Sequence, residues 1–126
     1  MYLDTDIILA LVKKNDWLKP YVNFNKIPSP LISTVTLIEL ELVINRELGK
    51  EEIPGFFKKI KELKVKISPV DENVVQKSAE LIGKYDMTIF DSIHAAFCII
   101  NNERILSSDT IFDHVKEISR IDPKEL

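Results

Sequence analysis

Four carboxylates occupy the same kind of position in the sequence, a point where a predicted strand or loop gives way to a helix. Asp4 and Asp109 follow short apolar stretches, whereas Glu39 and Asp91 lie about one turn into predicted helices. In a parallel sheet such junctions gather at one edge, where the ligands of open α/β sheets bind. Converging carboxylates repel one another, and Mg²⁺ or Mn²⁺ relieves the repulsion because these ions prefer oxygen ligands. One interpretation is therefore a metal site that activates water for attack on a phosphoryl group.

A structural interpretation of the same acids stays open. Glu39 follows Thr36 by three residues, as in a capping box, where an acid at the third helical position bonds back to the N-cap residue. Asp91 follows Thr88 with the same spacing. Asp109 is itself a good N-cap residue, because a short polar side chain satisfies free N–H groups at a helix start. Spacing alone does not decide between caps and a metal site.

Two local choices are also open on the first and second long helices. The first helix is predicted to begin near Thr5 or Asp6, and one of these residues is expected to cap it. Glu39 and Glu41 both lie in an otherwise apolar run, so periodicity allows either to face the sheet. Glu39 is nearer the helix start and is better placed for a site at the strand ends.

Short apolar stretches alternate with longer helical patterns along the whole chain, which favours an α/β fold with a parallel sheet covered by helices on both faces. At 126 residues, the chain is expected to form one domain spanning 1–126. The predicted strands are 2–3, 31–33, 65–70, 104–107 and 118–121, and the predicted helices are 5–12, 17–22, 37–48, 51–64, 72–85, 89–100 and 109–115, with Gly49 ending the third of them.

Composition limits the classes of function. Lys and Arg number 17 against 20 for Asp and Glu, a formal charge of −3, so electrostatics alone would not hold a nucleic acid. The apolar stretches are too short to span a membrane, and the N-terminus lacks the features of a signal peptide, so a cytoplasmic location is expected. The lone Cys98 excludes an internal disulfide and is expected to pack as a small hydrophobe.

Four segments around these acids resemble the motifs of PIN domains, the nuclease fold of VapC-like toxins in toxin–antitoxin pairs. The opening MYLDTD resembles the family's strand followed by Asp-Thr, and STVTLIEL resembles its second motif, which places the acid at Glu39 rather than Glu41. DSIHAA resembles the third motif, and ILSSDTIF resembles the fourth, with Ser107 where Thr is usual. Asp6 departs from the pattern, which more often has Asn or Ser. The resemblance covers nearly the whole chain.

This resemblance implies a three-layer α/β/α fold and cleavage of RNA that depends on Mg²⁺ or Mn²⁺. It further implies a homodimer and, for toxin members, an antitoxin whose C-terminal segment lies over the active site. Asp4, Asp91 and Asp109 would then hold one or two ions, and Glu39 would ligate an ion or orient the attacking water. Thr5 and Ser107 would hydrogen-bond a ligating carboxylate or the scissile phosphate, while Asp6 would tighten metal binding or cap the helix.

Other polar and aromatic residues are interpreted as structural. His94 is expected to be a satisfied, partly buried histidine, and His114 a surface residue. Phe56 and Phe57 are adjacent on a helix and cannot both face the core, so one is a candidate for a partner interface. Solvated positions are expected for the basic run Lys58, Lys59, Lys61, Lys64 and Lys66, and Arg46 and Lys84 have no positional support as phosphate contacts.

Two alternative functions fit parts of the sequence. Asp4-Thr5-Asp6 resembles the Asp-x-Asp signature of haloacid-dehalogenase-type phosphatases, in which the first Asp is a nucleophile, and Asp109 and Asp113 resemble that family's last acidic pair. This alternative leaves Glu39 and Asp91 without a role. The other alternative is a non-catalytic RNA- or protein-binding module of the same fold, whose acids serve as helix caps.

Overall fold

Five short parallel strands form the centre of the molecule in the computed structural model, which describes residues 1–126. Their order across the sheet is β3-β2-β1-β4-β5, and every neighbouring pair is parallel. This arrangement confirms the predicted α/β class. The strands are β1 (Tyr2–Leu3), β2 (Leu31–Ser33), β3 (Lys66–Ser68), β4 (Ile105–Leu106) and β5 (Arg120–Ile121).

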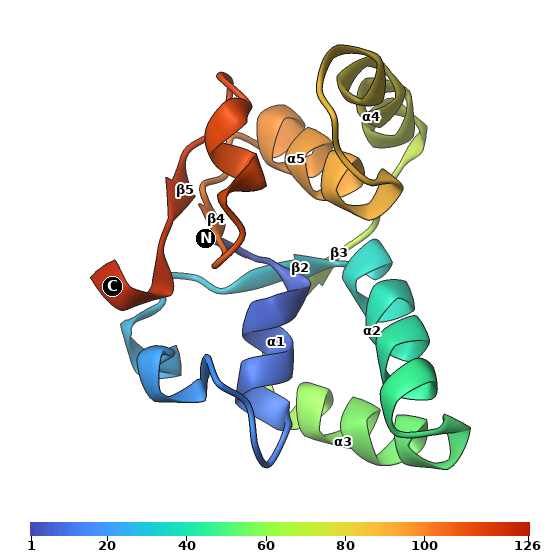
Figure 1. Ribbon diagram of the computed structural model, residues 1–126, viewed down its shortest axis with the longest axis vertical. Coiled ribbons are helices and arrows are strands. Elements are labelled where there is room, and N and C mark those ends of the chain that lie inside the picture. The colour runs from blue at the N-terminus through green and yellow to red at the C-terminus, as the bar shows by residue number, and fades with distance from the viewer.

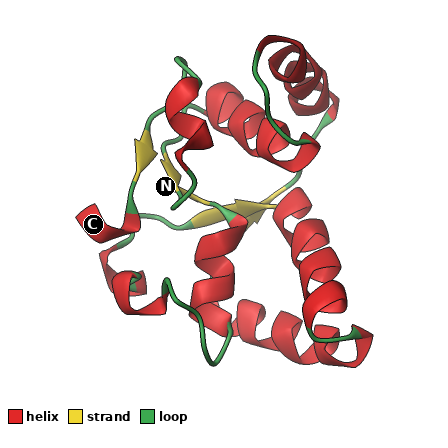
Figure 2. Cartoon of the chain, in the orientation of Figure 1, coloured by secondary structure: helices red, strands yellow, loops and turns green.

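Helices cover both faces of this sheet, as predicted (Figures 1 and 2). In Figure 1, α4 and α5 lie above the β2–β3 strands, whereas α1 and α3 lie below them and α2 flanks the sheet. The helices are α1 (Thr5–Val12), α2 (Thr34–Glu47), α3 (Ile53–Leu63), α4 (Glu72–Lys84) and α5 (Ile89–Asn101), with short 3₁₀ helices at Lys19–Tyr21, Phe24–Lys26, Lys50–Glu52, Thr110–His114 and Pro123–Glu125.

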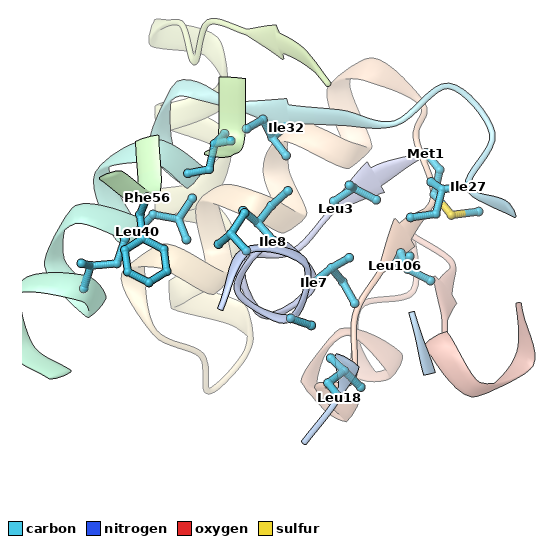
Figure 3. Packing of buried hydrophobic residues seen from close by; sticks show 14 residues of the cluster. Met1, Leu3, Ile7, Ile8, Leu18, Ile27, Ile32, Leu40, Phe56 and Leu106 are labelled. Carbon is cyan, nitrogen blue, oxygen red and sulfur yellow. The ribbon is translucent and has the colours of Figure 1, made fainter. Parts of the chain in front are cut away.

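The strands separate two hydrophobic cores because successive side chains of a strand point to opposite faces. Leu3, Ile32 and Leu106 pack with α1, α2 and α3 in one core (Figure 3). Tyr2 and Ile105, the neighbours of two of these residues, pack instead with α4 and α5. The ends of the strands are thereby fixed from both sides, and the residues that follow them are held in place.

The start of α2 differs from the sequence prediction. This helix begins at Thr34 rather than Leu37, because Ser33 is the N-cap and forms a capping box with Thr36. Thr36 therefore lies inside the helix, and the predicted capping box between Thr36 and Glu39 is wrong. Glu39 is consequently free of a capping role. At the other end Gly49 has a φ of 101°, a conformation that favours glycine, so its place at the helix end is as predicted.

Two shorter segments also differ from their predictions. Residues 109–115 form a 3₁₀ helix at Thr110–His114 rather than an α-helix, and residues 17–22 contain only the 3₁₀ turn Lys19–Tyr21. Pro20 lies within that turn and removes a backbone donor, which limits helical growth there. No helix in the structure has the length and apolar character needed to cross a membrane.

Candidate active site

The structure brings the four predicted acids together at the carboxyl edge of the sheet. Asp4, Glu39, Asp91 and Asp109 all line one cavity of about 370 Å³. Each comes from a different element: the residue before α1, the second turn of α2, the first turn of α5 and the residue before the Thr110–His114 helix. Glu41 is exposed and does not line this cavity. The remaining lining residues are Thr5, Asp6, Leu9, Val43 and Ser108.

Asp4 is the N-cap of α1, a role that the sequence analysis gave to Thr5 or Asp6. Its Oδ1 accepts a hydrogen bond from the backbone N–H of Thr5 (2.8 Å), and its Oδ2 accepts one from Ser107 Oγ (2.6 Å). Asp4 is only 7% exposed. Burial raises the pKa of its carboxyl above the ordinary value, although the charge of His94 and the bond from Ser107 oppose that rise. Asp4 is thus fixed in place at an electrostatic cost.

Glu39 lies beside Asp4 and is held by two donors. Thr5 Oγ1 and His94 Nε2 both bond to its Oε1, the second at 2.8 Å. Partial burial disfavours the Glu39 charge, but the bond and charge of His94, together with Thr5, outweigh it and lower the pKa of Glu39. The predicted bonds from Thr5 and Ser107 to site carboxylates are therefore present, one to each acid of this pair.

Asp6 adds a fifth carboxylate to the cavity. Its Oδ2 accepts bonds from the backbone N–H of Ser108 (2.9 Å) and from the Ser108 hydroxyl. The other oxygen, Oδ1, is buried and has no hydrogen-bond partner. Burial, followed by the charge of Asp4, raises the pKa of Asp6 to about 6. Asp6 therefore ties α1 to the segment after β4, and it does not cap the helix.

Asp91 and Asp109 form the more open side of the cavity. The backbone N–H of Asp91 donates to Thr88 Oγ1 (3.1 Å), so Thr88 caps α5 as predicted. Asp109 caps the short helix that follows it, because its Oδ1 accepts from the N–H of Ile111 (2.9 Å). Burial, partly offset by the bond from Thr88 and reinforced by the charge of Asp109, raises the pKa of Asp91.

His94 is a buried histidine with satisfied ring nitrogens, as predicted, and its bond to Glu39 also makes it part of the site. It is 0% exposed, and both ring nitrogens have partners: Nδ1 lies 2.6 Å from Tyr2 Oη and Nε2 lies 2.8 Å from Glu39 Oε1. Burial disfavours its charged form, but the bond to Glu39 and the charges of Asp4, Glu39 and Asp91 outweigh burial and raise the pKa of His94. One signal was available, because His94 is three residues after Asp91 and therefore lies on the same helix face.

The donor set fits a divalent cation with a preference for oxygen ligands. Several carboxylates share one small cavity, and burial, reinforced by the charges of neighbouring acids, raises the pKa values of Asp4, Asp6 and Asp91, so a nearby cation would favour their charged forms. The unpartnered Oδ1 of Asp6 is a further oxygen with no protein donor. A cation would supply the missing positive charge, so the residues present suit Mg²⁺ or Mn²⁺.

Several other predicted assignments can be compared with the structure. Cys98 is buried and free and His114 is exposed, as predicted. Phe56 is buried and the half-buried Phe57 packs against the same core, so a partner interface at one of them stays a prediction. The five lysines of the basic run are exposed, as are Arg46 and Lys84. Asp113 pairs with Arg120 at 2.9 Å and does not line the acidic cavity, so the second acidic pair of the phosphatase alternative is absent from the site.

Comparison with solved structures shows a shared fold. The VapC20 toxin of Mycobacterium tuberculosis, described as cleaving the sarcin-ricin loop, superposes with a TM-score of 0.76 at 16% identity, covering 91% of this chain and 94% of that one. DNA-bound VapBC from Salmonella typhimurium gives 0.74 at 16% identity, with 97% and 96% covered. A toxin–antitoxin complex from Klebsiella pneumoniae gives 0.69 at 17% identity, with 99% and 98% covered.

Sequence comparison gives the family. No functionally curated protein matches the chain significantly. The family model described as "PIN domain" matches residues 1–118, and this range contains all five carboxylates of the cavity. The chain therefore belongs to the PIN domain family.

Proposed function

We propose that this protein is a metal-dependent endoribonuclease that hydrolyses RNA phosphodiester bonds with Mg²⁺ or Mn²⁺, and that it is the toxin of a toxin–antitoxin pair. The observation that carries the proposal is the convergence of Asp4, Glu39, Asp91 and Asp109 on one cavity at the sheet edge. The chain's net charge of −3 agrees with it, because an acidic site needs a cation to accept a polyanion.

The cavity residues divide the chemical tasks among them. Asp4, Asp91 and Asp109 would hold the cation, with Asp6 as an additional oxygen donor. When bound, the cation polarises the phosphoryl oxygen and lowers the pKa of a bound water. Glu39 is ionised, since its pKa is lowered, and its carboxylate can ligate the cation or accept a hydrogen bond from the attacking water. Thr5 and Ser107 keep the carboxylates of Glu39 and Asp4 in fixed orientations.

The proposal is tested with a fluorescent single-stranded RNA incubated with the purified protein, with Mn²⁺, with Mg²⁺ or with EDTA. Cleavage is expected only with a divalent ion, and Glu39→Gln is expected to remove it. Glu41→Gln is the matched control, because it makes the same change on the same helix outside the cavity. Equal cleavage by both variants would contradict the assignment of Glu39. Phosphate release from a small phosphomonoester without RNA cleavage would favour the phosphatase alternative.

Calorimetric titration with Mn²⁺ tests the non-catalytic alternative. Wild-type protein is expected to bind Mn²⁺, and a variant in which the four acids are replaced by their amides is expected not to. Identical titrations of the two proteins would show that the acids act only as caps, and the enzyme proposal would fail.

The proposed partners are an antitoxin and a second copy of the chain. Support for the antitoxin comes from two of the similar structures, which are a VapBC complex and a toxin–antitoxin complex. The product of a short neighbouring gene with a DNA-binding N-terminus is expected to co-purify with this protein and to block RNA cleavage. Light scattering after size-exclusion chromatography is expected to give the mass of a dimer, and a monomer mass at micromolar concentration would contradict that part.

A further inference from the structure

A continuous chain of buried polar groups runs from strand β1 to the acidic cavity. Tyr2 Oη lies 2.6 Å from His94 Nδ1, and His94 Nε2 lies 2.8 Å from Glu39 Oε1. Tyr2 and His94 are both 0% exposed, so water does not compete for the bond between them, whereas Glu39 is partly exposed at the cavity. Polar groups in such surroundings are costly unless each has a partner. Tyr2 and His94 lie among mainly apolar side chains, so we expect these polar groups to have a role at the acidic cavity.

The hydrogen-bond partners of His94 determine which of its ring nitrogens carries a proton. Glu39 Oε1 is an acceptor, so His94 Nε2 must carry a hydrogen. An unprotonated Nε2 at 2.8 Å would direct its lone pair at the carboxylate and repel it. In the neutral ring, Nδ1 then accepts from the Tyr2 hydroxyl. In the charged ring, Nδ1–H donates to the same hydroxyl, which both donates and accepts. His94 therefore presents an N–H to Glu39 in both protonation states.

At the end away from the cavity, this series of hydrogen-bonded groups is anchored at the start of α2. Tyr2 Oη also lies 2.9 Å from Ser33 Oγ and 3.1 Å from Thr36 Oγ1, the two residues of the capping box. These hydroxyls allow the Tyr2 hydroxyl to be satisfied whichever way its proton points. The phenol and the imidazole are thereby fixed by contacts from β1, β2, α2 and α5 together.

The same contacts show that His94 acts on Glu39 and not on a cation. Both of its nitrogens already have partners, so neither has a free lone pair directed into the cavity. On Glu39, the bonds from His94 and Thr5 both end at Oε1, and Oε2 accepts no bond from the protein. One oxygen of Glu39 is therefore used to fix the carboxylate, and the other is left for the cavity.

We propose that Tyr2 and His94 form a positioning pair that sets the orientation of the Glu39 carboxylate and so tunes the affinity of the site for its cation. This inference rests on the proposed function, because it assumes that Glu39 serves a metal site. Outer residues that hydrogen-bond a metal-site carboxylate change metal affinity by about 10–100-fold when they are lost. We expect an effect of that size on Mn²⁺ binding, independent of catalysis.

The test compares two replacements of His94 by measuring Mn²⁺ dissociation constants by electron paramagnetic resonance. The amide nitrogen of Gln reaches about as far as Nε2, whereas that of Asn reaches only as far as Nδ1. His94→Asn is expected to weaken Mn²⁺ binding about 10–100-fold, and His94→Gln is expected to restore most of it. Equal weakening in the two variants would overturn the proposal, since both change the ring equally.

Two further variants separate positioning from a loss of stability and from failure of the proposed function. Phe97→Leu disturbs the ring packing on Tyr2, whose centroid lies 4.9 Å away, without touching the polar chain. It is expected to lower the melting temperature and leave Mn²⁺ affinity unchanged, and weakening like that of His94→Asn would overturn the proposal. Glu39→Gln sets the largest loss of Mn²⁺ affinity that the proposal allows. A residue that acts only through Glu39 cannot, when replaced, weaken binding more than the loss of Glu39 itself does.

Each remaining outcome is decisive. If the wild type itself binds no Mn²⁺, the proposed metal site fails. If the wild type binds Mn²⁺ and Glu39→Gln binds it equally well, Glu39 does not serve the metal site and the positioning proposal is overturned. If Glu39→Gln weakens binding but His94→Asn does not, only the positioning role fails. Affinity in His94→Asn below that of Glu39→Gln would assign His94 as a direct ligand instead. Should His94→Asn not fold, Tyr2→Phe carries the test: it is expected to weaken binding about tenfold, and no change would overturn the proposal.

Discussion

The two sides of the acidic cavity are built differently. Asp4 and Glu39 are fixed by bonds from residues far away in sequence, namely Ser107 at a separation of 103 and Thr5 and His94 at separations of 34 and 55. On the other side, the Asp109 carboxylate accepts only from the nearby N–H of Ile111, and the partner of the Asp91 side chain is Thr88, three residues away.

This difference indicates which part of the site is preformed. Bonds between distant elements exist only in the folded molecule, and they set the orientation of the Asp4 and Glu39 oxygens before any ligand arrives. Asp109 is exposed and Asp91 is half-buried, and with only nearby partners their carboxylates can adjust to a cation or a phosphate. The inner pair is therefore expected to determine metal binding, and the outer pair to adapt to what is bound.

The largest effect is expected from the inner pair. Asp4→Asn keeps a good N-cap for α1 but removes the charge of the most buried carboxylate of the cavity. We expect RNA cleavage to fall by at least about 100-fold, while the fold survives as judged by circular dichroism. Cleavage by purified Asp4→Asn at the wild-type rate would show that the preformed side of the cavity is not the catalytic side.

The negative charge on the inner side of the cavity can be tested at Asp6, through the pH dependence of the free energy of unfolding. Its pKa is about 6 in the folded protein against an ordinary value of 3.8, so the folded state binds the proton more tightly than the unfolded state. The stability that this carboxyl contributes is present below the ordinary value and is lost as the pH rises towards about 6. The contribution of Asp6 to the free energy of unfolding of the metal-free protein should therefore fall by about 2 kcal/mol between about pH 4 and about pH 7.

Asp6→Asn is expected to remove that loss, because its amide oxygen can still accept the bonds from Ser108. Urea unfolding in EDTA at the two pH values measures the difference. Saturating Mn²⁺ should restore the stability of the wild type at the higher pH, because a ligand that binds only the folded state stabilises it. The same pH dependence in wild type and variant would show that Asp6 titrates normally and bears no strain.

The contrast between local and distant bonds also explains what could be predicted from the sequence. The strands, most helix bounds and the cap at Asp109 depend on neighbouring residues, and these predictions agree with the structure. The Thr36 capping box was wrong because Ser33, at the end of β2, offers a cap three residues earlier. Local patterns give several acceptable starts for one helix, and packing of β2 on the sheet selects one.

The role of His94 was missed for a related reason. His94 and Tyr2 both lie in apolar runs, where a polar tip is easily interpreted as incidental. Their bond joins residues 92 positions apart, and no periodicity reports such a contact. A buried Tyr usually finds a partner for its hydroxyl, so Tyr2 in a strand was itself a signal for a polar neighbour. The four acids were easier to find, since each follows a strand or begins a helix.

A smaller effect is expected on the outer side. Asp109→Asn leaves the N-cap in place, since Asn caps as well as Asp, but it removes one charge from the exposed rim of the cavity. We expect Mn²⁺ affinity to fall about tenfold, which is about 1.4 kcal/mol, and less than for Asp4→Asn. Titration calorimetry on Asp109→Asn and Asp4→Asn under the same salt conditions shows which variant loses more Mn²⁺ affinity. A larger loss for Asp109→Asn would reverse the assignment of the two sides.

The smallest effect on the site is expected from the local cap beneath Asp91. Thr88→Ala removes the acceptor for the Asp91 N–H and should cost about 1 kcal/mol of folding stability, measured by urea unfolding. Because Thr88 is exposed, water can replace its hydroxyl at the Asp91 side chain, and Mn²⁺ affinity should stay within about twofold of the wild type. Ser107→Ala is the counterpart on the inner side, since it removes a bond to the Asp4 carboxylate itself. That variant should weaken Mn²⁺ binding by about tenfold. If Thr88→Ala weakens metal binding as much as Ser107→Ala, the outer side is as preformed as the inner side, and the distinction between them is wrong.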